Sequence, residues 1–134
     1  MGSSIDTEGR GFLTLDFEGV VSTVAGQILS QINPEGVMLA IIRTYAYFAT
    51  GSTGAANLTC GVAADAITDA SDILSAFDGI EGTVGGKMFN CQAVPANETE
   101  EAVIWEVGEY INMKGSATTV GLAGKLFIEY VRLA

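Results

Sequence analysis

The glycines of this chain constrain its fold more than any other feature. Seventeen of them occur in 134 residues, and they are spread along the chain rather than gathered into one linker. A glycine in a helix interior costs about 1 kcal/mol relative to alanine, whereas glycine is common in tight turns between short strands. We therefore expect many short strands joined by tight turns and little helix.

Apolar and polar side chains alternate with the period of a strand in several segments. The clearest is residues 37–48, which is apolar on both faces near its start and is predicted as a central strand. There the alternation places Leu39, Ile41, Arg43, Tyr45 and Tyr47 on one face. Residues 21–32 are compatible with either helix or strand. The other predicted strands are residues 12–17, 56–62, 83–91, 102–107, 109–113 and 118–133.

Three connections carry recognisable signals. Residues 33–36, Asn-Pro-Glu-Gly, predict a turn. The TGSTG run at residues 50–54 resembles a phosphate loop only in composition, because no lysine or helix follows it, so we expect it to join two strands as a hairpin. Residues 65–77 have apolar side chains at helical spacing and predict one or two turns of helix.

Together these elements predict an all-β chain. About eight strands with one or two short helical turns describe an antiparallel β-sandwich or jelly roll. No shift in composition marks a second domain, so residues 20–134 are predicted as a single β-sandwich domain. Residues 1–19 are predicted as an N-terminal arm with a possible first strand, which orders on a partner.

Composition restricts the partners. Apolar residues make up 49% of the chain, and a core this small is expected to leave apolar patches exposed where another protein binds. We therefore expect a homo-oligomer or a component of a lattice. The net charge is −10 and the six basic residues are scattered, which argues against nucleic acid and anionic membranes. The longest apolar run, residues 37–42, is too short to span a membrane, and the first ten residues lack an export signal, so we expect synthesis in a cytoplasm.

Residue types also restrict the chemistry. The chain has no histidine, which removes the Ser-His-Asp and Cys-His forms of catalysis and the common zinc sites. Cys60 and Cys91 are predicted as buried free thiols, with a disulfide as the alternative. We predict that the chain is not an enzyme and that it has no catalytic residues, cofactor or metal.

Two groups of acidic residues are candidate sites. Asp65, Asp69 and Asp72 lack the spacing of a calcium loop, so a capping or solvated role is favoured over weak calcium binding. The second group surrounds Trp105, which is predicted to lie in the core but is alternatively a platform for a sugar together with Tyr110. Its carboxylates, predicted as surface charge rather than as a glycosidase pair, are Glu98, Glu100, Glu101, Glu106 and Glu109.

Three stretches of the chain resemble small head proteins of tailed bacteriophages. They are NPEGVMLAIIRTYAYFATGSTGAANLTCGVAADA at residues 33–66, GEYINMKGS at residues 108–116 and ATTVGLAGKLFIEYVRL at residues 117–133. The resemblance implies a jelly-roll-like domain, often a trimer, that decorates or cements the outer surface of a capsid. It implies other copies of the chain and the major capsid protein as partners, and a place on the virion after synthesis in the host cytoplasm. The family has no catalytic residues to carry over.

The leading hypothesis is therefore a structural virion protein, a capsid decoration or cement subunit that stabilises the lattice of a phage head. The alternative is a carbohydrate-binding jelly-roll module on a virion or tail, with Trp105, Tyr45 or Tyr47 as stacking platforms.

Overall fold

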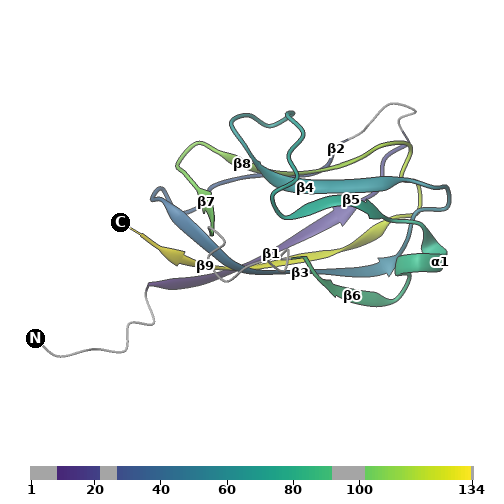
Figure 1. The fold of residues 1–134 in the computed structure, drawn as a ribbon, viewed down its shortest axis with the longest axis horizontal. Coiled ribbons are helices and arrows are strands. Elements are labelled where there is room, and N and C mark those ends of the chain that lie inside the picture. The colour runs from purple at the N-terminus through teal and green to yellow at the C-terminus, as the bar shows by residue number, and fades with distance from the viewer. Residues whose placement is uncertain (1–8, 22–26, 92–101, 134) are drawn as a thin grey trace, which may run out of the picture.

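Two antiparallel sheets face each other in the structure (Figure 1). The computed structural model describes residues 9–21, 27–91 and 102–133. Its elements are β1 (Arg10–Glu18), β2 (Gln27–Ile32), β3 (Leu39–Thr50), β4 (Asn57–Ala63), β5 (Leu74–Asp78), α1 (Glu81–Val84), β6 (Lys87–Asn90), β7 (Val103–Trp105), β8 (Tyr110–Gly115) and β9 (Ala123–Arg132). No helix among these residues is long and apolar enough to cross a membrane.

The strand order is that of a jelly roll. The first sheet runs β1-β9-β3-β6, and the three-residue β7 pairs with the same side of β3 at the opposite end from β6. The second sheet runs β2-β8-β4-β5. Without β7, each sheet has four strands, and most connections cross from one sheet to the other. The predicted all-β antiparallel sandwich with a short helical turn is confirmed, and the possible first strand is β1.

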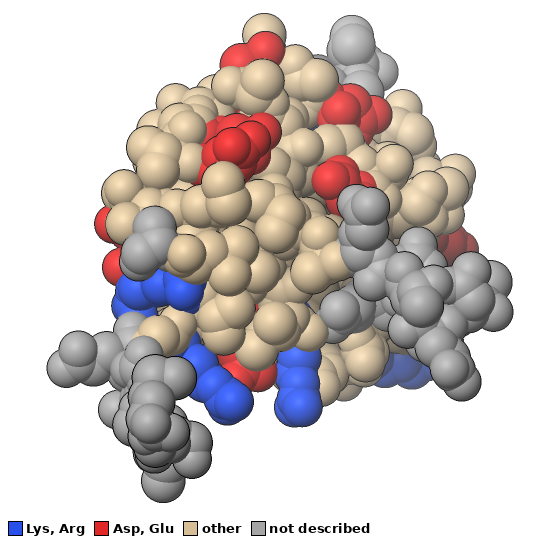
Figure 2. Space-filling view, turned by 60° about the vertical axis from the view of Figure 1, so that its left-hand side comes forward, with Lys and Arg blue, Asp and Glu red and all other residues tan. Residues whose placement is uncertain are grey.

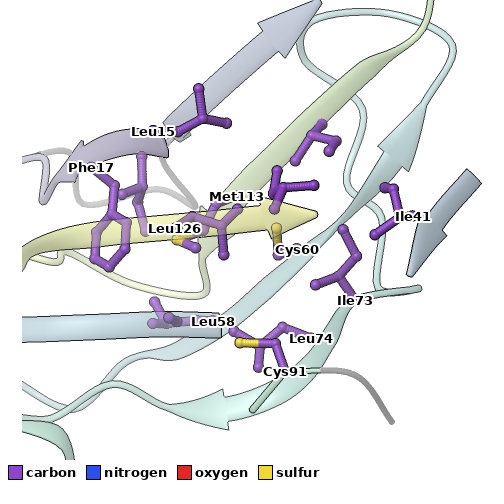
Figure 3. Packing of buried hydrophobic residues seen from close by; sticks show 14 of the residues in the cluster. Leu15, Phe17, Ile41, Leu58, Cys60, Ile73, Leu74, Cys91, Met113 and Leu126 are labelled. Carbon is purple, nitrogen blue, oxygen red and sulfur yellow. The ribbon is translucent and has the colours of Figure 1, made fainter. Parts of the chain in front are cut away.

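One apolar core fills the space between the sheets. Figure 3 shows side chains of both sheets pointing into this space, among them Leu126 of the first sheet and Met113 of the second. Phe48 of β3 packs against Phe17 of β1 and against Phe77 of β5, with ring centroids 5.4 and 5.9 Å apart. Because the rings come from both sheets, each sheet depends on the other to bury its apolar face.

β3 is a central strand, as predicted, but its alternation changes at a bulge. Its register with β9 shifts between Ile41 and Arg43. A bulge adds one residue to one strand, so the side chains beyond it change faces. Leu39 and Ile41 therefore face the core, whereas Tyr45 and Tyr47, half-buried and exposed, lie with Arg43 on the outer face. The prediction that all five share one face is wrong.

The TGSTG connection at residues 50–54 does not form a hairpin. β3 lies in the first sheet and β4 in the second, so the connection crosses between the sheets. The N–H of Gly51 donates to Oε2 of Glu81 at 2.7 Å, and the N–H of Thr53 donates to the carbonyl of Val120 at 2.9 Å. These bonds tie the connection to α1 and to the segment before β9. The hairpin prediction failed because alternation does not determine which strands pair.

The predicted helix at residues 65–77 is also wrong. Oδ1 of Asp65 accepts the N–H of Thr68 at 2.8 Å, as at the start of a helix. The carbonyls of Asp65 and Thr68, however, accept the side-chain amide of Asn112 at 2.8 and 2.9 Å, in place of backbone N–H groups four residues on. The chain forms a loop at residues 64–73, which we call the cover loop, and then enters β5.

Other predicted boundaries changed less. The predicted strand at residues 83–91 begins within α1 and contains β6, while β9 begins five residues into the segment 118–133. Residues 27–32 of the ambiguous segment form β2, and residues 22–26 lie outside the described part of the chain. The turn at residues 33–36 is present, with Gly36 at φ 72°.

Candidate interaction surface

The cover loop lies over the outer face of the second sheet (Figure 1). Asn112 of β8 points outward beneath it and is only 1% exposed. Its amide donates to the carbonyls of Asp65 and Thr68, and its Oδ1 accepts Ser30 Oγ at 2.7 Å and Gln27 Nε2 at 3.1 Å. One side chain thus joins two strands of the sheet to the loop above them.

Further contacts hold the loop near Asn112. The ammonium of Lys114 donates to the carbonyl of Ile67 at 2.9 Å, and the hydroxyl of Thr59 donates to Asp69. Gly61 leaves room for the loop, because a Cβ there would lie 2.7 Å from the backbone nitrogen of Asp72. The cover loop therefore covers part of the outer face of the second sheet.

No described element covers the outer face of the first sheet in the same way. We call the outward side chains of β1, β9, β3 and β6 the open face. Phe12 is 75% exposed, Met88 is 55% exposed and Tyr47 is 38% exposed, while Tyr45 and Phe127 are half-buried. Large apolar side chains that lie together at a surface usually mark a contact with another protein.

The strand register brings these side chains into neighbouring rows. Phe127 of β9 pairs with Tyr45 of β3, and in the next row Tyr47 of β3 pairs with Met88 of β6. Facing residues of paired strands have Cβ atoms about 5 Å apart. The aromatic rings and the methionine therefore form one continuous patch rather than isolated exposed residues.

Ion pairs cross the same face. The ammonium of Lys125 lies 2.6 Å from Oδ1 of Asp16, and Nε of Arg43 lies 3.7 Å from Oε1 of Glu129. The outward charged residues of its strands are balanced, three of each sign: Arg10, Arg43 and Lys125 against Asp16, Glu18 and Glu129. The open face is therefore neutral in a chain whose net charge is −10.

Basic residues are concentrated on the first sheet. Figure 2 shows them along the lower side of the molecule, with acidic groups above. Five of the six basic residues lie on its strands, and only Lys114 lies on the second sheet: the five are Arg10, Arg43, Lys87, Lys125 and Arg132. The sequence shows these residues as scattered because the strands that carry them are far apart along the chain.

A charged cluster lies at one end of the first sheet. Arg132 donates to Oε2 of Glu35 at 2.7 Å, and the hydroxyl of Tyr130 donates to the same oxygen. These hydrogen bonds, first from Arg132 and then from Tyr130, hold the pKa of Glu35 below its ordinary value. Burial, with Glu35 nearby, raises the pKa of Tyr130. The cluster ties the turn at residues 33–36 to β9.

The candidate site residues named from the sequence lie in different parts of the fold. Trp105 is fully buried, as predicted, and its indole N–H donates to the carbonyl of Glu109 at 2.9 Å, so the ring is not available to stack on a sugar. Asp65 caps its own loop, which lowers its pKa through hydrogen bonds from backbone N–H groups and the Thr68 hydroxyl. Within the described ranges, no three Asp, Glu, Cys or His side chains are placed to hold a metal ion. Glu98, Glu100 and Glu101 lie outside those ranges.

Cys60 and Cys91 are buried free thiols, as predicted, and the disulfide alternative is wrong. Burial raises the pKa of Cys91 to about 11 and raises that of Cys60 as well. Neither thiol is poised as a nucleophile, because the thiolate is the reactive form.

Sequence reasoning missed two features. Asn112 gave no signal beyond being a polar residue that is uncommon in strands. The open face was missed because its residues come from four strands, and the bulge in β3 decides that Tyr45 and Tyr47 belong to it. Comparisons of the chain with protein-family models, curated proteins and solved structures gave no match.

Proposed function

We propose that the protein is a structural subunit of a virus head. In this proposal it is a homo-oligomer that binds the outer surface of the shell formed by the major capsid protein and holds neighbouring capsomers together. The observation that carries the proposal is the open face, an apolar and charge-balanced sheet surface that no described element covers. The choice of a virus head as the assembly rests on the resemblance of residues 33–66 and 108–133 to phage head proteins.

Physical arguments support this role. Burying the open face removes apolar surface from water, at about 25 cal/mol per Å². The face is neutral, so it approaches another protein without the repulsion expected of the acidic remainder of the chain. Jelly rolls serve viral capsid proteins and lectins alike, so the fold by itself supports neither role over the other. No catalytic role is proposed.

Sedimentation equilibrium tests the oligomer. The purified chain is expected to sediment at a multiple of its 13.9 kDa mass. A strict monomer at the highest soluble concentration contradicts this part of the proposal, because the proposed copies meet each other through apolar surface.

Binding to shells tests the open face. Empty heads of the virus that encodes the chain, assembled without it, are mixed with the protein and then pelleted and imaged. Wild-type protein is expected to pellet with the heads and Met88→Glu is expected to stay in solution, because a carboxylate would be buried at the contact. Ile67→Glu is the matched control, since Ile67 is 73% exposed but lies on the cover loop. Equal binding by all three proteins rejects the open face as the contact.

Carbohydrate binding remains a second candidate because two tyrosines lie on the open face. Tyr47 is 38% exposed and Tyr45 is half-buried beside it on β3. Tyrosine rings at a surface can stack on sugars, whereas Trp105 cannot since it is buried. Glycan-array binding that Tyr47→Ala abolishes would favour this candidate. An array without signal would leave the head subunit as the proposal.

A further inference from the structure

β1 differs from every other edge strand that the structure describes. It has nine residues and pairs with β9 without a register shift. The opposite edge of the first sheet is made of β6 and β7, with four and three residues. In the second sheet, β2 and β5 each pair through an irregular register. Short or irregular edges resist pairing with another chain, whereas a long regular edge invites it.

Hydrogen-bond alternation shows which groups of β1 face outward. The carbonyl of Gly9 accepts the N–H of Arg132, and the N–H of Gly19 donates to Leu122, so the odd-numbered residues bond to β9. The N–H and C=O groups of Phe12, Thr14, Asp16 and Glu18 therefore point away from the sheet, while the carbonyl of Arg10 accepts the guanidinium of Arg132. A carbonyl oxygen has two lone pairs, so Arg10 can still accept a bond from another strand and the open edge runs from Arg10 to Glu18.

We propose that this edge pairs antiparallel with β1 of a second copy of the chain, about a two-fold axis at Thr14. This inference rests on the oligomer of the proposed function and names its contact. The outward-facing groups of two antiparallel copies lie opposite each other only when the numbers of two facing residues add up to an even number. The register centred on Thr14 meets this condition and pairs the whole strand Arg10–Glu18 with itself. A register centred on either side leaves part of the edge unpaired.

The charges of β1 favour the same register. Arg10 begins the strand, and Asp16 and Glu18 end it, all on the outer face and all exposed. In the antiparallel pair, Arg10 of each copy lies opposite Glu18 of the other, whereas a parallel pair would place like charges side by side. The strand is thus complementary to a reversed copy of itself in backbone and in charge.

The pairing has a consequence for the proposed function. It joins the first sheets of two copies into one continuous sheet, and the two open faces become one surface. An isologous contact of this kind gives a dimer or an assembly built from dimers, in place of the trimer that the resemblance implies.

Cross-linking tests the register. Facing residues of a hydrogen-bonded antiparallel pair have Cα atoms about 5.5 Å apart, which a disulfide can bridge. Thr14→Cys is expected to form a covalent dimer under mild oxidation. Glu18→Cys is the matched control on the same exposed strand, because its two copies would lie about 27 Å apart. The native thiols are buried and contribute little background. Equal cross-linking of both variants, or none of Thr14→Cys, overturns the pairing.

Proline tests the backbone contact. The N–H of Thr14 faces away from β9, so Thr14→Pro removes a hydrogen bond to the second copy but none within the sheet. It is expected to raise the dissociation constant of the oligomer about tenfold or more, whereas Thr14→Ala keeps the N–H and leaves it unchanged. Should Thr14→Pro fail to fold, the cross-linking comparison decides.

The outcomes separate this inference from the proposed function. An assembly with an even number of copies that cross-links at position 14 supports the pairing. A trimer whose association is insensitive to Thr14→Pro overturns the pairing and leaves the head subunit standing. A protein that stays monomeric at every concentration overturns the pairing and the oligomer together, and the binding of Met88→Glu to heads then tests the shell contact alone.

Discussion

At the scale of single residues, Asn112 determines the shape of the second sheet's outer surface. Its side chain makes four hydrogen bonds, which use both amide N–H groups and both lone pairs of the oxygen: two with the cover loop, one with Ser30 and one with Gln27. A buried amide in a strand is tolerated because both its N–H groups and its oxygen have hydrogen-bond partners. The loop therefore takes its conformation from a residue about 45 positions later in the chain.

Asn112→Ala is expected to lower the free energy of unfolding by about 2 kcal/mol, because two loop carbonyls and the side chains of β2 lose their hydrogen-bond partner. Denaturant unfolding measures the change. Ser30→Ala is the control, since it removes only one of these bonds, and is expected to cost about 1 kcal/mol or less. Equal losses for the two variants would show that Asn112 is not the centre of the network.

Glu35 makes stability depend on acid pH. Its pKa is lowered in the folded chain by Arg132 and Tyr130 from an ordinary value of 4.5. The stabilisation is therefore fully present above about pH 4.5 and is lost as the pH falls through the lowered pKa. The difference in unfolding free energy between wild type and Glu35→Gln is expected to shrink in that window. Glu106→Gln, an exposed carboxylate outside the cluster, is the control; a difference independent of pH contradicts the assignment.

Cys91 makes stability depend on alkaline pH. Burial raises its pKa from 9.0 to about 11, so its contribution is complete below pH 9.0 and is lost as the pH rises towards 11. Both thiols are expected to react slowly with a thiol reagent in the native chain and rapidly in denaturant. Fast labelling of the native chain below pH 9.0 would contradict the buried positions of Cys60 and Cys91.

At the scale of elements, the cover loop and β4 fit closely only because residue 61 is glycine. A Cβ there would meet the backbone nitrogen of Asp72 at 2.7 Å and the carbonyl carbon of Ala70 at 2.9 Å. Gly61→Ala is expected to cost about 1 to 3 kcal/mol and to speed hydrogen exchange in residues 64–73. Gly54→Ala is the control, because no atom lies within 4 Å of the added methyl. Unchanged exchange in the loop would reject the close contact.

Strands could be predicted where the alternation of apolar and polar residues matches the buried and exposed faces in the fold. Alternation found β1, β3, β4, β8 and β9, because a strand with one buried face carries that face in its own sequence. The helix at residues 65–77 was predicted wrongly because its apolar spacing and cap are local, whereas the competing bonds from Asn112 are not. The open face was beyond prediction, since a bulge of one residue in β3 determines which tyrosines point outward.

At the scale of the whole molecule, the single tryptophan reports on the core. Trp105 is fully buried, and the core cluster contains residues of both sheets. Unfolding is therefore expected to be one cooperative transition, in which the red shift of tryptophan emission and the loss of strand signal in circular dichroism coincide in denaturant. Separate transitions would mean that the two sheets lose their structure independently, against the prediction of a single domain.

The fold class could be inferred without coordinates, because alternation and dispersed glycine predict an antiparallel sandwich. The absence of histidine likewise excludes catalysis by Ser-His-Asp and Cys-His sets. Those properties are local or compositional, so no contact between distant residues is needed to infer them. The fold alone shows the jelly-roll order and the side-chain amide that replaces a helix with a loop. It also shows the sheet face and the strand edge that no described element covers. Each of these depends on residues far apart in the chain, whose pairing is chosen by the packing of one shared core.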